Sequence, residues 1–215
     1  MSGNQSYIEQ SIAALKTIDA ERLSAARLTM PSNIGSETEF YSLGWPRAYR
    51  RIHVGLKVPR PDRQVEVARR FRDELSMISL LADRLPDLRA KLPRFMGSLL
   101  VAGETKALIT EDVSKVLVKP IRQVRVSEAT RNLLRLEFCS EYQPLENVFD
   151  EDLLNRRVAF MVGGSEMLLD FSPVPILEEQ RAGSGLYVHL VEAMSRASEL
   201  SIEVPEGSNL GQALA

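Results

Sequence analysis

The segment from about Val65 to Leu85 constrains the fold most, because it predicts one long helix with a charged residue inside its apolar stripe. Apolar residues recur along it at helical spacing, at Phe71, Leu75, Ile78 and Leu81. Pro86 then ends the pattern. Glu74 lies on the same stripe, and a carboxylate that becomes buried needs a cationic partner. The segment therefore predicts a helix that packs on a second layer and meets a cation there.

Short strand-like segments stand on both sides of this helix. Residues 40–43 and 52–58 precede it, and residues 95–101 and 107–110 follow it. The turn Ala102-Gly103-Glu104 joins the last two. In the second strand, alternation puts Lys57 on the face of Gly55 and turns the apolar neighbours to the other face. Together these segments predict an α+β fold, with an antiparallel sheet and one long helix laid on it.

The remaining segments predict further helices and one small hairpin. We expect helices over residues 7–28, 127–138 and 186–200, with Ser127 as the N-cap of the second. Two apolar stretches at 158–162 and 167–169 flank Gly163-Gly164-Ser165-Glu166, which predicts a hairpin. The chain would then divide into three parts: a polar leader and N-terminal helix (1–28), a lobe with the sheet (29–113) and a reduced, mostly helical lobe (114–215).

Composition and charge argue against several classes of protein. The 215-residue chain carries a formal net charge of −2, which gives no reason to expect nucleic acid or an anionic membrane as its partner. No apolar run approaches the roughly twenty residues of a membrane helix. The single cysteine, Cys139, excludes an intramolecular disulfide and indicates a reducing compartment. With His53 and His189 it forms no spacing typical of a zinc site.

The order of the expected elements resembles that of a protein kinase, and two local motifs carry the resemblance. Val54-Gly55-Leu56-Lys57-Val58 is similar to the kinase strand whose lysine bridges the α- and β-phosphates of ATP. The resemblance makes Glu74 the residue that orients Lys57 through an ion pair. Met167-Leu168-Leu169-Asp170-Phe171-Ser172 is similar to the Asp-Phe-Gly element, so Asp170 would bind the magnesium that bridges the phosphates.

Two further segments match places where a kinase contacts the nucleotide through its backbone. The segment Asn33–Thr38 leads into the expected strand at residues 40–43, and its small residues Gly35 and Ser36 would let backbone amides approach the phosphates. The segment Ile109–Val113 continues from the expected strand at residues 107–110. By the resemblance it is the hinge whose backbone, at Glu111 and Val113, meets adenine.

The catalytic loop has two alternatives. Asp150 stands five residues before Asn155, which is the usual spacing between the base aspartate and the metal-binding asparagine. Asp152-Leu153 instead reproduces the usual Asp-Leu pair, but Arg157 then falls where the asparagine should be. The expected catalytic base is therefore Asp150 or Asp152, and Asn155 is an expected magnesium ligand.

The short chain after Ser172 and the polar leader are similar to the HopBF family of type III effector kinases. That resemblance implies an ATP- and magnesium-dependent enzyme that is made in the bacterial cytoplasm and secreted into the host cell cytoplasm. Its substrate would be a host protein, the chaperone heat-shock protein 90. We expect a monomer that binds neither nucleic acid nor membrane.

Two other functions stay open. A small-molecule phosphotransferase of the aminoglycoside or choline type shares the sheet lobe and a hinge like Thr110-Glu111-Asp112, although it needs a larger acidic lobe. A pseudokinase that acts as a binding module is favoured by the single glycine of the phosphate loop and by the irregular catalytic loop. ATP turnover by the wild type and by Asp170→Ala separates the pseudokinase from both enzymes.

Overall fold

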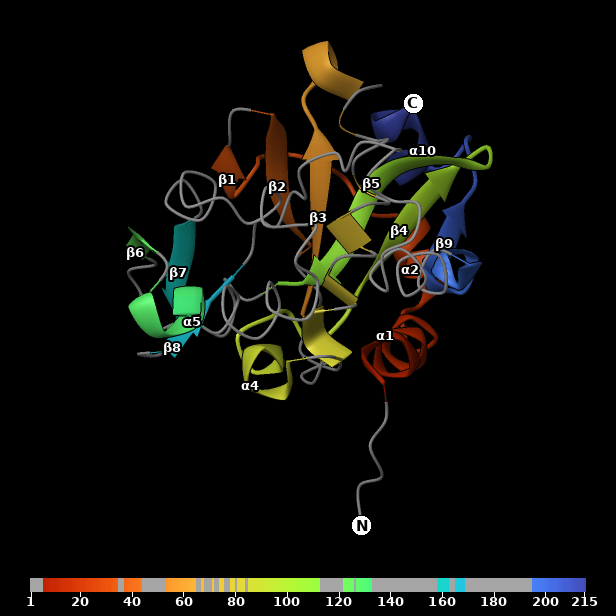
Figure 1. Ribbon diagram of the computed structural model, residues 1–215. Coiled ribbons are helices and arrows are strands. Elements are labelled where there is room, and N and C mark those ends of the chain that lie inside the picture. The colour runs from red at the N-terminus through yellow and green to blue at the C-terminus, as the bar shows by residue number, and fades with distance from the viewer. Residues whose placement is uncertain are drawn as a thin grey trace, which may run out of the picture.

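A computed structural model describes the protein over residues 6–34, 37–43, 53–64, 67, 71, 74–75, 78–79, 81–83, 85–112, 122–125, 127–132, 158–162, 165–168 and 195–215. These residues form two sheets and several short helices, which makes the protein a mixed α+β fold (Figure 1). The fold class predicted from the sequence is confirmed at this level.

Six strands form the first sheet, in the order β1-β2-β3-β5-β4-β9. They are β1 (Asn33–Ile34), β2 (Thr38–Leu43), β3 (Val54–Pro59), β4 (Met96–Val101), β5 (Glu104–Glu111) and β9 (Ser201–Val204). All neighbouring pairs are antiparallel except β4 and β9, which are parallel. The expected strands before and after the long helix correspond to β2, β3, β4 and β5, so the antiparallel sheet predicted from the sequence is present.

The N-terminal segment differs from the single helix expected over residues 7–28. It forms α1 (Tyr7–Leu15) and α2 (Ala20–Ser24). The break occurs because Asp19 caps the second helix and accepts a 3.1 Å hydrogen bond from the backbone N–H of Arg22. α1 contacts β4 and α2 contacts β9, so both helices pack on the first sheet.

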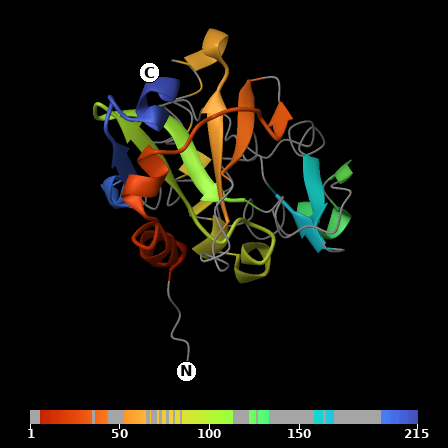
Figure 2. The same ribbon diagram turned by 180° about the vertical axis from the view of Figure 1, so that it is seen from behind.

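Helical residues lie on this sheet where the sequence predicts one long helix. Every described position between 64 and 83 is helical, and we call this segment the central helix. The 3₁₀ turn η2 (Pro61–Arg63) precedes it and the short helix α4 (Pro86–Arg89) follows it. Its apolar stripe supplies several of the most buried side chains: Phe71, Leu75, Ile78 and Leu81. Figures 1 and 2 show the central helix on one side of β3 and β5, and the chain between α2 and β1 on the other.

A two-residue turn joins β4 to β5 at the predicted place. Ala102 and Gly103 both have positive φ, at 52° and 76°. Two successive residues with positive φ match the twist of the strands they connect. The N–H of Gly103 also donates to the Glu203 carboxylate at 3.1 Å, which ties the turn to β9.

A second sheet has three antiparallel strands in the order β6-β7-β8. They are β6 (Arg122–Arg125), β7 (Val158–Val162) and β8 (Ser165–Met167). The predicted hairpin is confirmed in β7 and β8. Ser127 caps α5 (Glu128–Asn132) as expected, since its hydroxyl accepts from the backbone N–H of Thr130 at 3.2 Å. β6 was not predicted, because its two arginines and one glutamine give no apolar alternation.

The C-terminal residues correct two expectations. Of the helix expected over residues 186–200, the described part is residues 195–200, and it ends in the 3₁₀ turn η6 (Ala197–Leu200). β9 and α10 (Asn209–Leu214) follow and pack with the first sheet and with α2. Residues 201–214 were expected in a second lobe, but they belong to the first sheet and to the helices packed on it. The described part of residues 114–215 contributes four strands and is not mostly helical.

Within the described ranges, no helix is both long and apolar enough to cross a membrane.

Candidate functional site

Lys57 lies in the interior of the first sheet. β3 has β2 on one side and β5 on the other, and Lys57 pairs with Phe40 and Leu108. Because paired residues share a face of a sheet, these three side chains lie on one face, together with that of Ser42 two residues along β2. The Lys57 side chain is 12% exposed. The strand thus fixes the lysine on a rigid element while its side chain keeps some access to solvent.

Glu74 meets Lys57 from the central helix. The Lys57 ammonium donates to both carboxylate oxygens of Glu74, over 2.9 and 3.0 Å. Glu74 is 2% exposed, and a carboxylate at that depth is stable only with a partner that offsets its lost hydration. The position of Glu74 in the apolar stripe predicts a cationic partner, the kinase resemblance implies that this is Lys57, and the structure shows this ion pair.

Phe40 lies beside the ion pair on the same face. A Cβ atom on Gly55 would collide with the far end of the Phe40 ring, so the ring lies over the glycine. Only a residue without a side chain leaves this space to the aromatic ring. The face therefore combines a cation and an aromatic surface, which suits a ligand with an anionic part and a planar part.

A buried carboxylate closes one end of this face. Asp112 directly follows β5 and is fully buried at 0% exposure. It accepts a hydrogen bond from the Ser42 hydroxyl, and its backbone N–H donates to the His53 carbonyl at 2.7 Å. Sequence reasoning did not single out this side chain, because an acidic residue at a strand end ordinarily faces solvent.

Glu111, which the sequence places near adenine, directs its side chain elsewhere. It lies on the opposite face of β5 from the residues that pair with Lys57 and Gly55. Its carboxylate accepts from the backbone N–H of Arg94 at 2.8 Å and from Nε of Arg94 at 2.6 Å. The side chain is thus engaged on the far side of the sheet, and the expected ligand contact would come from the backbone.

The other predicted site residues lie outside the described part of the chain: Gly35, Ser36, Val113, Asp150, Asp152, Asn155 and Asp170. Among the residues that are described, no group of three or more histidine, cysteine, aspartate or glutamate side chains is arranged to hold a metal ion. The predicted magnesium ligands, Asp170 and Asn155, both belong to the part that is not described. Of the predicted site, the structure therefore brings together Lys57 and Glu74.

A second polar cluster joins β8 and α5 to the stretch between α4 and β4, and we call it the Glu166 cluster. Lys91 donates to Glu166 at 3.0 Å and to Thr130 at 2.6 Å, and the Ser127 N–H donates to Glu166 at 2.6 Å. The Lys91 carbonyl also accepts from the Leu168 N–H at 2.7 Å. Burial by itself would raise the pKa of Glu166, but the hydrogen bonds from Thr130, Ser127 and Lys91 lower it to about 2. No local pattern in the sequence marks this cluster, since its members come from three distant segments.

None of the protein-family models, curated proteins or solved structures compared with the chain matches it. Its function must therefore be inferred from the residues themselves.

Proposed function

We propose that this protein is an ATP- and magnesium-dependent protein kinase in which Lys57, oriented by Glu74, contacts the phosphates. The observation that carries the proposal is the buried ion pair between β3 and the central helix, with N–O distances of 2.9 and 3.0 Å. The pair lies between a mostly antiparallel sheet and a helix packed on one of its faces. This is the arrangement that the sequence predicts around Lys57 and Glu74.

The ion pair would be costly as a purely structural device. Two charges lose their hydration when they are buried, and apolar side chains of similar volume often stabilise a core as well or better. Lys57 keeps 12% of its side chain exposed, whereas Glu74 keeps 2%. This asymmetry favours a lysine that is presented to an anionic ligand and a glutamate that orients it from behind.

The residues around Lys57 fit the two chemical parts of ATP. An ammonium group has three donors, so it can hold a carboxylate and a phosphate at the same time. The ring of Phe40 offers an aromatic surface for a planar base next to the cation. Asp170 and Asn155 would hold magnesium, which neutralises charge on the phosphates.

In the proposed reaction the side chains of the protein mainly orient the reactants. Lys57 fixes the phosphates, and the backbone at Gly35 and Ser36 covers them. Asp150 or Asp152 accepts the proton of a substrate hydroxyl group. The hydroxyl oxygen forms a bond to the γ-phosphorus while the bond from that phosphorus to the leaving oxygen of ADP breaks.

For the substrate, we propose a host protein, and by resemblance to the HopBF family the chaperone heat-shock protein 90. The protein would reach it after secretion from a bacterium into the host cell. Incubating the protein with radiolabelled ATP and a host lysate, followed by identification of the labelled band, tests this step. Label on the chaperone is expected; label on another protein, or on a small molecule, would replace the proposed substrate.

Phosphoryl transfer by matched lysine variants tests the catalytic proposal. Lys57→Arg keeps the charge but changes the donor geometry, and the rate should fall by about 10²-fold or more. Lys106→Met removes a lysine whose partner, Glu104, is 73% exposed, and should leave the rate unchanged. A wild-type rate for Lys57→Arg would refute the role of the lysine. Equal background transfer by the wild type and Asp170→Ala would favour the binding module instead.

A further inference from the structure

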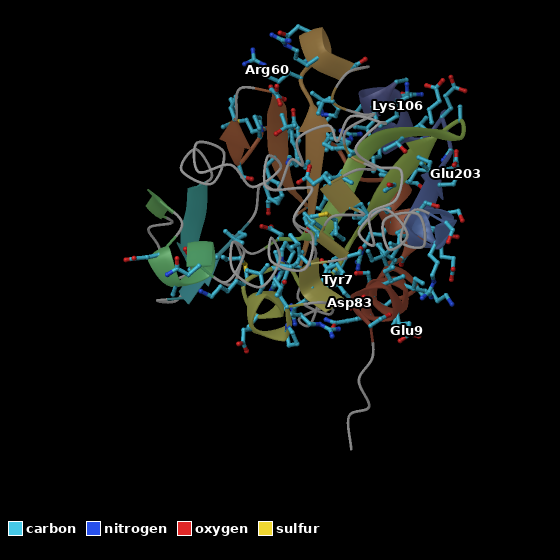
Figure 3. The ribbon with its side chains drawn as sticks, viewed as in Figure 1. Tyr7, Glu9, Arg60, Asp83, Lys106 and Glu203 are labelled. Carbon is cyan, nitrogen blue, oxygen red and sulfur yellow. The ribbon has the colours of Figure 1, made fainter. Side chains whose placement is uncertain are left out.

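Helix α1 is bonded along one side to the stretch that joins the central helix to β4. Five hydrogen bonds make the connection: Tyr7 N–H to Asp83 (2.6 Å), Tyr7 hydroxyl to the Pro93 carbonyl (2.8 Å), Gln10 to the Arg94 carbonyl (2.9 Å), Arg89 to Gln10 (2.7 Å) and Met96 N–H to Ser11 (3.3 Å). Figure 3 shows Tyr7 and Asp83 next to each other at one end of the sheet. α1 therefore bridges the central helix and β4, which follow one another in the chain through a loop and the short helix α4.

Asp83 is placed where the end of one helix meets the start of another. It lies in the last turn of the central helix, where the exposed carbonyl groups disfavour a carboxylate. The first N–H groups of α1 have no partner within their own helix and carry partial positive charge. The 2.6 Å bond from the Tyr7 N–H to the Asp83 carboxylate offsets both deficits.

Tyr7 links this contact to the start of β4. Its side chain is 1% exposed, and its hydroxyl donates to the Pro93 carbonyl at 2.8 Å. Burial raises the pKa of the Tyr7 hydroxyl, so the group keeps its proton and stays a donor at ordinary pH. One residue therefore holds the end of the central helix and the approach to β4 at a fixed separation.

Glu74 stands nine residues before Asp83 on the central helix, which is about 13 Å along the axis of an α-helix. A shift or tilt at the Asp83 end would move Glu74 relative to Lys57, because every described position from 74 to 83 belongs to the same helical segment. We propose that α1 is an internal brace that keeps Glu74 paired with Lys57, with Tyr7 and Asp83 as its positioning residues. Its effect on catalysis rests on the proposed function, whereas its effect on the ion pair does not.

The chemical reactivity of Lys57 tests the brace without an activity assay. Brief treatment with acetic anhydride, followed by mass spectrometry, gives the ratio of labelling at Lys57 to labelling at Lys106. Asp83→Ala removes the acceptor and should raise this ratio about ten-fold, the factor expected for losing a hydrogen bond to a charged group. Asp83→Asn keeps an acceptor oxygen but loses the charge, so its ratio should lie between those of the wild type and Asp83→Ala. Tyr7→Phe, which removes only the hydroxyl, should raise the ratio roughly five-fold.

Ser208→Ala is the matched control. The Ser208 hydroxyl caps α10 by accepting from the Gly211 N–H at 3.0 Å, and it makes none of the five contacts of α1. The hydroxyl also donates to the Pro205 carbonyl at 2.6 Å, so the variant loses two hydrogen bonds. It therefore corrects for general loss of stability and should leave the labelling ratio unchanged. Equal ratios for Asp83→Ala, Tyr7→Phe and Ser208→Ala, measured well below their unfolding temperatures, would overturn the brace. If Asp83→Ala does not fold, Tyr7→Phe against Ser208→Ala decides.

Activity measurements separate the two proposals. With an active wild type, Asp83→Ala should lower kcat/KM for ATP about ten-fold, and Asp83→Asn should lower it less. An inactive wild type whose Lys57 labelling still responds to Asp83→Ala would refute the kinase and leave the brace in place. An active enzyme with unchanged Lys57 labelling in Asp83→Ala and Tyr7→Phe would refute the brace and leave the proposed kinase function in place.

Discussion

At the scale of single residues, two buried or nearly buried charges face each other across 2.9 Å at Lys57 and Glu74. Each charge lost its hydration when it was buried, and the opposite charge offsets the free-energy cost of that loss. We therefore expect the pair to affect the free energy of unfolding whether or not it takes part in catalysis. It also explains why Lys57→Arg, which keeps the charge, is a better probe of function than Lys57→Ala.

Lys57→Met should destabilise the protein by about 3–5 kcal/mol, because it leaves Glu74 buried without this partner. Adding Glu74→Met removes the second charge and should recover most of the loss. Urea unfolding of the wild type, both single variants and the double variant measures the coupling free energy. If the double variant is no more stable than Lys57→Met, the loss of stability in Lys57→Met does not come from the buried charge of Glu74.

A second residue-scale prediction concerns the turn at Ala102. Alanine at a φ of 52° carries a steric cost that glycine does not, and the Ala102 side chain is exposed, so it contributes no packing to offset that cost. Ala102→Gly should therefore stabilise the protein by about 1 kcal/mol. Gly103→Ala, at a φ of 76°, should change stability in the opposite direction. Thermal unfolding of the two variants checks the pair of signs.

At the scale of elements, Gly97 is the point where three of them approach one another. A Cβ atom there would lie 2.5 Å from the Leu200 carbonyl oxygen and 2.6 Å from a methyl carbon of Leu15. The first of these is backbone, which cannot rotate away. β4 can therefore hold α1 and η6 at their present distance only with glycine at this position.

Gly97→Ala should destabilise the protein by about 1–3 kcal/mol, since β4 must move away from α1 and η6. Gly207→Ala is the matched control, because a Cβ atom at that position meets nothing within 4 Å. Circular dichroism during heating gives the unfolding temperature of each variant. Equal shifts for the two would mean that the close approach at Gly97 does not limit the packing.

The elements that could be predicted from the sequence are those with local signals. The central helix has a helical apolar stripe, and the β4–β5 and β7–β8 hairpins have glycine-containing turns between apolar stretches. The break after α1 and the strand β9 were missed, since the first depends on a single cap at Asp19 and the second on pairing with a distant strand. Pairing with a strand that is distant in the sequence does not change the local residue pattern, and propensity and periodicity depend only on that local pattern.

The candidate site divides in the same way. The Lys57–Glu74 contact was predictable, because a charge in an apolar stripe demands a partner and a central strand supplied it. The burial of Asp112 and the position of Glu111 on the far side of the sheet were not predictable. Each depends on contacts with residues distant in the sequence, Ser42 for Asp112 and Arg94 for Glu111.

At the scale of the whole molecule, the Glu166 cluster connects the second sheet to Lys91, in the stretch between α4 and β4. The pKa of Glu166 is about 2 in the folded protein, against an ordinary value of 4.5. The folded state therefore binds this proton less readily than the unfolded state. The stabilisation is complete above about pH 4.5 and is lost as the pH falls through about 2.

Glu166→Gln should lower the free energy of unfolding at pH 7 by about 1–3 kcal/mol, because it replaces a charged acceptor with a neutral one. The difference from the wild type should shrink as the pH falls from 4.5 towards 2, where the wild-type carboxylate takes up its proton. Urea unfolding at several pH values in this range gives both quantities. A difference that stays constant with pH would show that Glu166 does not contribute through its charge.

The parallel pairing of β9 with β4 has a consequence for biosynthesis. Ser98 pairs with Ser201, so the ribosome completes β4 about a hundred residues before its neighbour exists. At usual elongation rates the nascent chain spends roughly 5–20 s with that strand edge open. An open edge can pair with other chains, so newly made protein is most prone to aggregate in this interval, and slow translation of the later codons would lengthen it.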